Sequence, residues 1–200
     1  MKKAFKISAG FLFSMVLLAG CGMSVQRVSS DTVSDISDKW NDTDASQVAQ
    51  GMVSECLSEP WLANAQAAEG HNPSVIIGTI HNKSMEHIDT DTFTEDIQRE
   101  LINSGKVKFV ASSAQRGEIR GERLDQDLNA SAETRKAMGQ ETGADFMMQG
   151  TLDAIQQQEG GKEVMFYEVN LQLINLATND ISWIGQKKIK KLIKRPGYSL

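Results

Sequence analysis

The last third of the chain has the repeat of a β-sheet rather than that of a helix. Three segments rich in β-forming residues, 145–156, 163–176 and 181–193, are separated by the turn sequences EGGK and ATND. In the middle segment apolar residues alternate with polar ones: Tyr167, Val169, Leu171 and Leu173 against Glu168, Asn170 and Gln172. Because successive side chains of a strand point to opposite faces, this predicts an antiparallel meander with one wetter face.

The first part of the folded region has a helical repeat instead. A helix is predicted to begin near Asp42 or Thr43, both suitable N-cap residues, and to end at Pro60. Its apolar stripe consists of Val48, Ala49, Met52, Val53, Cys56 and Leu57. We interpret Cys56, which lies within this stripe, as a small buried hydrophobe rather than a catalytic or redox group.

Strands and helices alternate in the middle of the chain. Strands are predicted at 74–80 and 107–110, around a helix at 91–103 that stops at Gly105. The apolar face of that helix is predicted to contain Phe93, Ile97, Leu101 and Ile102. Two further elements are predicted: a peripheral helix or irregular helix-loop at 112–128 and a helix at 132–141 capped by Ser131.

The element order predicts an α/β fold on the border with α+β. We expect a mixed β-sheet with an antiparallel C-terminal meander, flanked by helices. A length of 200 residues with 40% hydrophobic content supports one such domain, placed at 40–200.

The N-terminus has the pattern of a secretory signal peptide at residues 1–20. Lys2, Lys3 and Lys6 make a basic start, residues 7–18 are apolar, and small residues precede Cys21. The apolar run is shorter than the roughly 20 residues that a transmembrane helix needs. Residues 22–41 are rich in Ser, Asp and Thr without an apolar face, so a flexible tether is predicted at 21–39.

The stretch Leu18-Ala19-Gly20-Cys21 closely resembles the bacterial lipobox. The resemblance implies cleavage before Cys21, diacylglycerol on its sulfur and further acylation. Stable attachment to a membrane needs more than one acyl chain. Residue 22 is Gly rather than Asp, which by the sorting rule of Gram-negative lipoproteins implies the periplasmic face of the outer membrane.

Charge and cysteine content exclude several functions. Of the 21 lysines and arginines, three lie in the signal peptide, so 18 stand against 26 acidic residues. A chain this acidic is poorly suited to nucleic-acid binding. With Cys21 lipidated, Cys56 is the one remaining cysteine, and no intrachain disulfide can form.

No sequence motif of an enzyme, metal site or cofactor site is found, and we predict no catalytic activity, metal or cofactor. His81 and His87 flank Glu86, so a metal site can be imagined there, but the spacing fits no rigid element. Carboxylate pairs such as Asp89 with Asp91 lie in charge-rich segments, where they are more often plain surface.

Basic residues cluster near the C-terminus: Lys187, Lys188, Lys190, Lys191, Lys194 and Arg195. One interpretation is a positive surface for an anionic partner, such as lipid phosphates or an acidic protein face. The other, which we favour, is an edge strand protected by lysines against pairing with neighbouring chains. Both can hold together.

Short stretches mark the element order from Trp40 onward: Trp40-Asn41, Asn82-Lys83-Ser84, Asn103-Ser104-Gly105-Lys106, Thr142-Gly143-Ala144-Asp145, and 169–176 followed by Ile181-Ser182-Trp183. In this order and spacing the chain resembles the LpoB family, lipoproteins that activate a class A penicillin-binding protein. The broader fold is similar to the N-terminal domain of TolB.

The resemblance implies a non-catalytic regulator, expected to be a monomer, that reaches through the peptidoglycan and binds the synthase's small accessory domain. The alternative is an outer-membrane-attached assembly module that contacts a different envelope partner through its basic C-terminal strand. The best-known family members have a long Pro-rich linker, whereas residues 22–41 contain no proline. Twenty residues extend to at most ~70 Å.

Overall fold

The computed structural model describes residues 29, 39–136, 141–159 and 162–194, without the side chain of residue 194. Cys21, the signal peptide, most of the predicted tether and Arg195 therefore lie outside the described residues. The helices are α1 (Asp42–Cys56), α2 (Pro60–Glu69), α3 (Thr90–Asn103) and α4 (Ser113–Asn129). The strands are β1 (Ser74–Asn82), β2 (Lys108–Phe109), β3 (Phe146–Glu159), β4 (Lys162–Asn175) and β5 (Ile181–Lys194).

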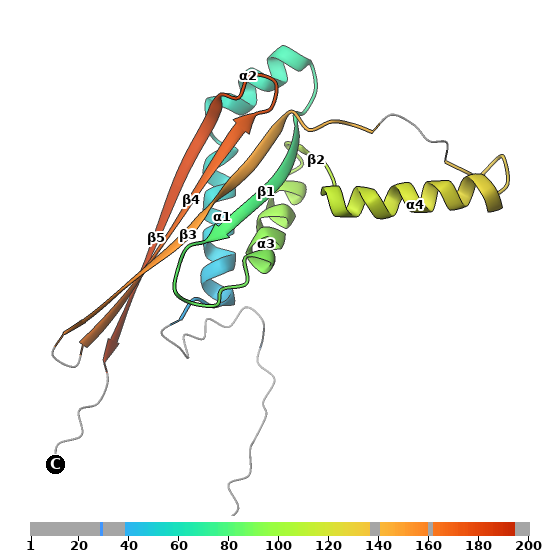
Figure 1. The fold of residues 1–200 in the computed structure, drawn as a ribbon. Coiled ribbons are helices and arrows are strands. Elements are labelled where there is room, and N and C mark those ends of the chain that lie inside the picture. Colours follow the sequence, from blue (N-terminus) through green and yellow to red (C-terminus); the bar gives the residue numbers. More distant parts are fainter. Residues whose placement is uncertain (1–28, 30–38, 137–140, 160–161, 195–200) are drawn as a thin grey trace, which may run out of the picture. The chain divides into compact units, whose positions relative to one another are not determined.

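The five strands form one mixed sheet in the order β2-β1-β3-β4-β5 (Figure 1). β1 is parallel to β2 and β3, whereas β3, β4 and β5 are antiparallel. Helices α1 and α3 pack together on one face, α1 along β5 and α3 along β1. The predicted fold class and the C-terminal meander are confirmed. No described helix is long and apolar enough to cross a membrane.

The two faces of β4 differ as its alternation predicts. The four predicted core residues Tyr167, Val169, Leu171 and Leu173 are at most 1% exposed beneath the helices. Glu168, Asn170 and Gln172 point to the other face and are half-buried among their neighbours. Figure 1 shows no described helix over that second face, which we call the open face.

Helix α1 begins one residue earlier than predicted, because its N-cap is Asn41 rather than Asp42 or Thr43. The Asn41 side chain accepts a hydrogen bond from the Asp44 N–H at 3.0 Å, and the Asp44 carboxylate accepts one from the Asn41 N–H at 3.1 Å. This reciprocal pair is a capping box. The predicted stripe of α1 is confirmed, since its six residues are at most 6% exposed.

The prediction that Pro60 ends the first helix was wrong. Helix α1 ends at Cys56, and Pro60 opens α2 at its first turn, where a missing N–H costs no hydrogen bond. The indole N–H of Trp61 donates to the Cys56 carbonyl at 2.6 Å. It thereby satisfies one of the carbonyls that the end of α1 leaves without a partner.

Two predictions about helices were wrong in part: one residue on the buried face of α3, and the helix predicted at 132–141. On α3, Phe93, Ile97 and Leu101 are at most 1% exposed, but Ile102 is 48% exposed. The buried residues recur every four positions, and Ile102 lies off that line. Residues 132–134 form a turn, and 132–136 contain no helix where one was predicted; the N–H groups of Thr134 and Arg135 both donate to the Ser131 carbonyl. The rest of that prediction, 137–140, falls outside the described residues.

We expect the Cys56 thiol to be unreactive in the folded protein. The residue is fully buried, and burial raises its pKa to about 12. In a Cys21→Ser variant with Cys56 as the single thiol, a disulfide reagent at about pH 8 should react at least a hundredfold faster in urea than in buffer. The raised pKa also means that burial of the neutral Cys56 thiol contributes to the free energy of unfolding. This contribution is complete below about pH 9 and is lost as the pH rises towards 12. Equal rates in buffer and urea would contradict the buried position.

Candidate partner-binding surfaces

The chain is fixed to the sheet where the predicted tether ends. The Trp40 N–H donates to the Tyr167 hydroxyl oxygen at 2.9 Å, and that hydroxyl donates to the Glu86 carboxylate at 2.9 and 3.0 Å. The Trp40 ring meets Phe93 and Tyr167 edge-on, with centroids 5.9 and 5.6 Å apart. Burial, aided by the Glu86 carboxylate, raises the pKa of Tyr167. The hydroxyl therefore stays protonated as a donor at neutral pH.

A second clamp joins the same region to β5. The Lys191 ammonium lies 2.5 Å from a carboxylate oxygen of Asp44 and donates to the Lys39 carbonyl at 2.9 Å. The two side chains are 12% and 8% exposed. Lys191 was predicted as a basic contact residue for a partner. Its ammonium group instead forms an ion pair and a hydrogen bond within the domain. The chain is thus held to the domain from Lys39 on.

The other described lysines of the basic cluster divide between the two faces of β5. Lys187 lies on the helix side, where its Nζ would be 3.4 Å from a Cβ added at Gly51. Lys188 lies on the open face, 3.4 Å from Glu168 and 5.9 Å from the ring centroid of Phe166. Lys190 is exposed on that same face. Since strand side chains alternate, the four lysines of the cluster whose side chains are described do not make one continuous surface.

The loop after β1 does not assemble the imagined metal site. The Asn82 side-chain amide donates to the Glu86 carbonyl at 2.8 Å, and the loop folds back so that Glu86 meets Tyr167. His81 and His87 are both exposed on either side of it. Within the described ranges, no group of three potential ligands stands close enough to hold a metal ion.

A large hollow lies between α2, the end of α1 and the start of β5. Its volume is about 710 Å³, and it is lined by Trp61, Trp183, Ile184 and three carboxylates, those of Glu55, Glu59 and Glu69. No lysine or arginine is among its described lining residues. We call it the acidic hollow.

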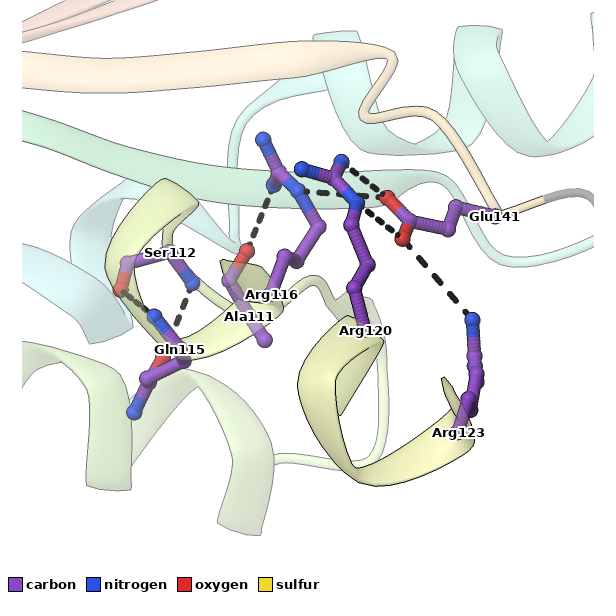
Figure 2. A network of polar contacts seen from close by, with 7 residues as sticks. All are labelled: Ala111, Ser112, Gln115, Arg116, Arg120, Arg123 and Glu141. Carbon is purple, nitrogen blue, oxygen red and sulfur yellow. Dashed lines mark hydrogen bonds and ion pairs between the residues drawn. The ribbon is translucent and has the colours of Figure 1, made fainter. Parts of the chain in front are cut away.

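Helix α4 extends from the domain with none of its residues buried (Figure 1). Figure 2 shows the contacts that hold α4. The Arg120 guanidinium donates two hydrogen bonds to the Glu141 carboxylate, at 2.8 and 2.9 Å, and the Arg116 guanidinium donates to the Ala111 carbonyl at 2.6 Å. Arg116 and Arg123 also approach Glu141, at 3.6 and 3.8 Å. The hydrogen bonds from Arg120 lower the pKa of the Glu141 carboxyl. The predicted peripheral helix at 112–128 is confirmed.

We expect α4 to be the most easily opened helix, and alanine at Gly117 and Gly121 to stabilise it. A Cβ at either position meets nothing within 4 Å. Each substitution should add about 0.5–1 kcal/mol to the local opening free energy of α4. Amide hydrogen exchange over 113–129 measures this, while the melting temperature should change little. Glu141→Gln should act in the opposite direction. Unchanged amide exchange over 113–129 in the alanine variants and in Glu141→Gln would contradict this description of α4.

Sequence patterns pointed to part of these surfaces. Trp40 and Asn41 were singled out by their place before the first helix, but their partners Tyr167, Glu86 and Lys191 are distant in the chain. The acidic hollow depends on α2, which was not predicted. The alanine-rich stretch after Pro60 was the available signal for that helix.

Comparison with known protein families identifies the class of protein. A family described as "Peptidoglycan-synthase activator LpoB" matches residues 44–189, from the first turn of α1 into β5. The match covers more than half of the chain and most of the folded domain. The chain therefore belongs to the LpoB family, whose described role is to activate peptidoglycan synthases. Among curated proteins, none matches this chain.

Several solved structures are similar. The LpoB C-terminal domain from Escherichia coli is 17% identical, with a TM-score of 0.45, over 74% of this chain and 99% of that one. The corresponding domain from Salmonella enterica is 16% identical, with a TM-score of 0.41, over 76% and 99%. The NMR structure of E. coli LpoB is 14% identical, with a TM-score of 0.41, over 96% and 92%.

Proposed function

We propose that this protein is attached through a lipid on Cys21 to the periplasmic face of the outer membrane. From there it binds and activates a class A penicillin-binding protein. The observation that carries the proposal is the family match over 44–189, which extends from the first turn of α1 into the last strand of the sheet. The lipobox-like stretch ending at Cys21 supplies the point of attachment.

Activation in this proposal is a binding effect and not a reaction. A regulator raises the activity of a synthase when it binds the active conformation more tightly than the inactive one. A tenfold shift of that equilibrium needs a difference of about 1.4 kcal/mol in binding free energy. A few well-placed surface contacts can supply this difference.

The tether limits where the partner can be. In this proposal the tether runs from Cys21 to residue 38, because the clamps at Trp40 and Lys191 fix the chain to the domain from Lys39 on. A chain of ~18 residues reaches at most ~65 Å when fully extended. We expect deletion of ten residues from 25–38 to abolish function in cells, with the domain still folded. A Gly/Ser segment of equal length in their place should restore it.

Binding is the direct test of the proposal. The full-length lipoprotein in detergent should be retained by an immobilised class A penicillin-binding protein from the same organism. A Cys21→Ser variant should bind equally in this assay but fail in cells, because it has lost only its attachment. Failure to bind any class A synthase of the organism would overturn the proposal.

Two exposed lysines of the open face, Lys188 and Lys190, offer a separate contact to an anionic envelope partner. Lys188 and Lys190 point away from the helices, unlike Lys187 and Lys191. With Lys188→Gln and Lys190→Gln combined, we expect synthase binding to stay unchanged and cross-linking to a second envelope partner to be lost. Reduced synthase binding would instead assign these lysines to the synthase contact.

A further inference from the structure

The charge of the side chains along the free edge of the sheet changes halfway along β5, the outermost strand. Its second half contains Lys187, Lys188, Lys190 and Lys191, whereas residues 181–186 carry no charge. Lysines on an edge strand oppose pairing with another chain. The first half of β5 lacks that protection, over a length typical of one β-strand.

Two exposed isoleucines lie along the open-face side of this uncharged edge. Ile181 and Ile184 are 57% and 69% exposed. Ile181 pairs with Ile174 and Ile184 with Gln172, while Trp183 pairs with the buried Leu173. An irregularity in the register therefore places both isoleucines on the open face and Trp183 on the helix side.

On the helix side, the same edge borders the acidic hollow. Ser182 and Trp183 line it together with Glu55, Glu59 and Glu69. Glu69 lies 3.7 Å from the Nδ1 of His71, and neither Glu55 nor Glu59 forms an ion pair with any described residue. An arriving strand would meet negative charge on this side and apolar surface on the other.

We propose that residues 181–186 bind an extended segment of a partner protein by strand addition. Main-chain hydrogen bonds join the segment to β5, and alternate side chains give specificity. Lysine or arginine residues of the segment face the acidic hollow, and the apolar residues between them lie beside Ile181 and Ile184. This inference does not depend on the partner being a synthase.

The test uses the full-length lipoprotein in detergent and a fluorescein-labelled hexapeptide of alternating valine and lysine. We expect a saturable rise in fluorescence anisotropy. The same peptide N-methylated at alternate amides should bind at least about tenfold more weakly, because it cannot complete the ladder. An alternating valine–glutamate peptide should not bind. Absence of saturable binding by the lysine peptide, or equal binding of all three, would overturn the proposal.

Matched variants locate the site. Ile184→Lys extends the lysine protection onto the uncharged edge and should weaken peptide binding at least about tenfold, because it places a charge beside the valines of the peptide. Leu192→Lys is its control, because Leu192 is 59% exposed on the same face but in the protected half of β5. The pair Glu55→Gln and Glu59→Gln should weaken binding about fivefold. Glu95→Gln with Glu118→Gln, both exposed and outside the hollow, should not.

Two further outcomes would decide against the proposal. Equal effects of Ile184→Lys and Leu192→Lys would show that the edge is not the site. Sedimentation velocity that finds a dimer of the lipoprotein abolished by Ile184→Lys would mean that a second copy of this chain covers the edge. If the peptide binds as expected but no synthase does, the synthase assignment fails while the edge proposal stands.

Discussion

Replacing Gly150 with alanine is expected to destabilise the protein more than any other single methyl group added to the sheet. Gly150 lies in β3 between β1 and β4, in register with Ile80 and Leu171. An added Cβ would overlap the carbonyl oxygen of Asn170 and lie 2.7 Å from Leu171 Cδ2. The first of these atoms belongs to the main chain of a paired strand, so it cannot rotate away.

The expected loss of unfolding free energy is about 3 kcal/mol or more, at the upper end of the cost of overpacking. That is a large share of the 5–15 kcal/mol that typically holds a domain together. Urea denaturation followed by circular dichroism measures the difference. Gly143→Ala is the control, since its Cβ would meet nothing within 4 Å, and it should change stability by less than about 0.5 kcal/mol. Equal stability of both variants would contradict the close approach of β3 and β4.

Replacing Lys191 with methionine is expected to have the second-largest effect. The substitution leaves the Asp44 carboxylate, 8% exposed, without its cation and removes the hydrogen bond to the Lys39 carbonyl. Breaking a buried ion pair from one side costs about 3–5 kcal/mol. Since this pair keeps slight solvent contact, we expect about 2–4 kcal/mol.

Lys188→Met is the matched control on the same strand. Its pair with Glu168 is 51% and 27% exposed, so its removal should cost about 0–1 kcal/mol. Adding Asp44→Asn to Lys191→Met should recover part of the loss, because no unpaired charge then stays buried. Similar losses for Lys191→Met and Lys188→Met would show that the Asp44 contact does not stabilise the domain.

The parts of the fold that depend on local periodicity were predictable. The stripe of α1 and the alternation in β4 each describe one face of one element, and both are buried as expected. The role of Pro60 was predicted wrongly because proline can either end a helix or open one. Here the helix-forming residues after Pro60 decide that it opens α2. Ile102 misled because one position along a helix turns a side chain by about 100° away from the core.

The candidate surfaces were less predictable because they join distant residues. The lysine cluster was visible in the sequence, but the strand repeat sends Lys188 and Lys191 to opposite faces. The partner of Lys191, Asp44, sits at the other end of the domain sequence, and no local pattern connects them. The uncharged half of β5 could be seen as a gap in the lysine pattern, but its significance depends on the acidic hollow beside it.

The central claim is that this domain activates a peptidoglycan synthase, and the rate of glycan-strand polymerisation tests it most directly. A class A penicillin-binding protein of the same organism is given lipid II with and without the full-length lipoprotein in detergent. We expect a saturable increase of about tenfold in the polymerisation rate, which corresponds to about 1.4 kcal/mol of differential binding. An unchanged rate with every class A synthase of the organism, at lipoprotein concentrations that saturate binding, would contradict it.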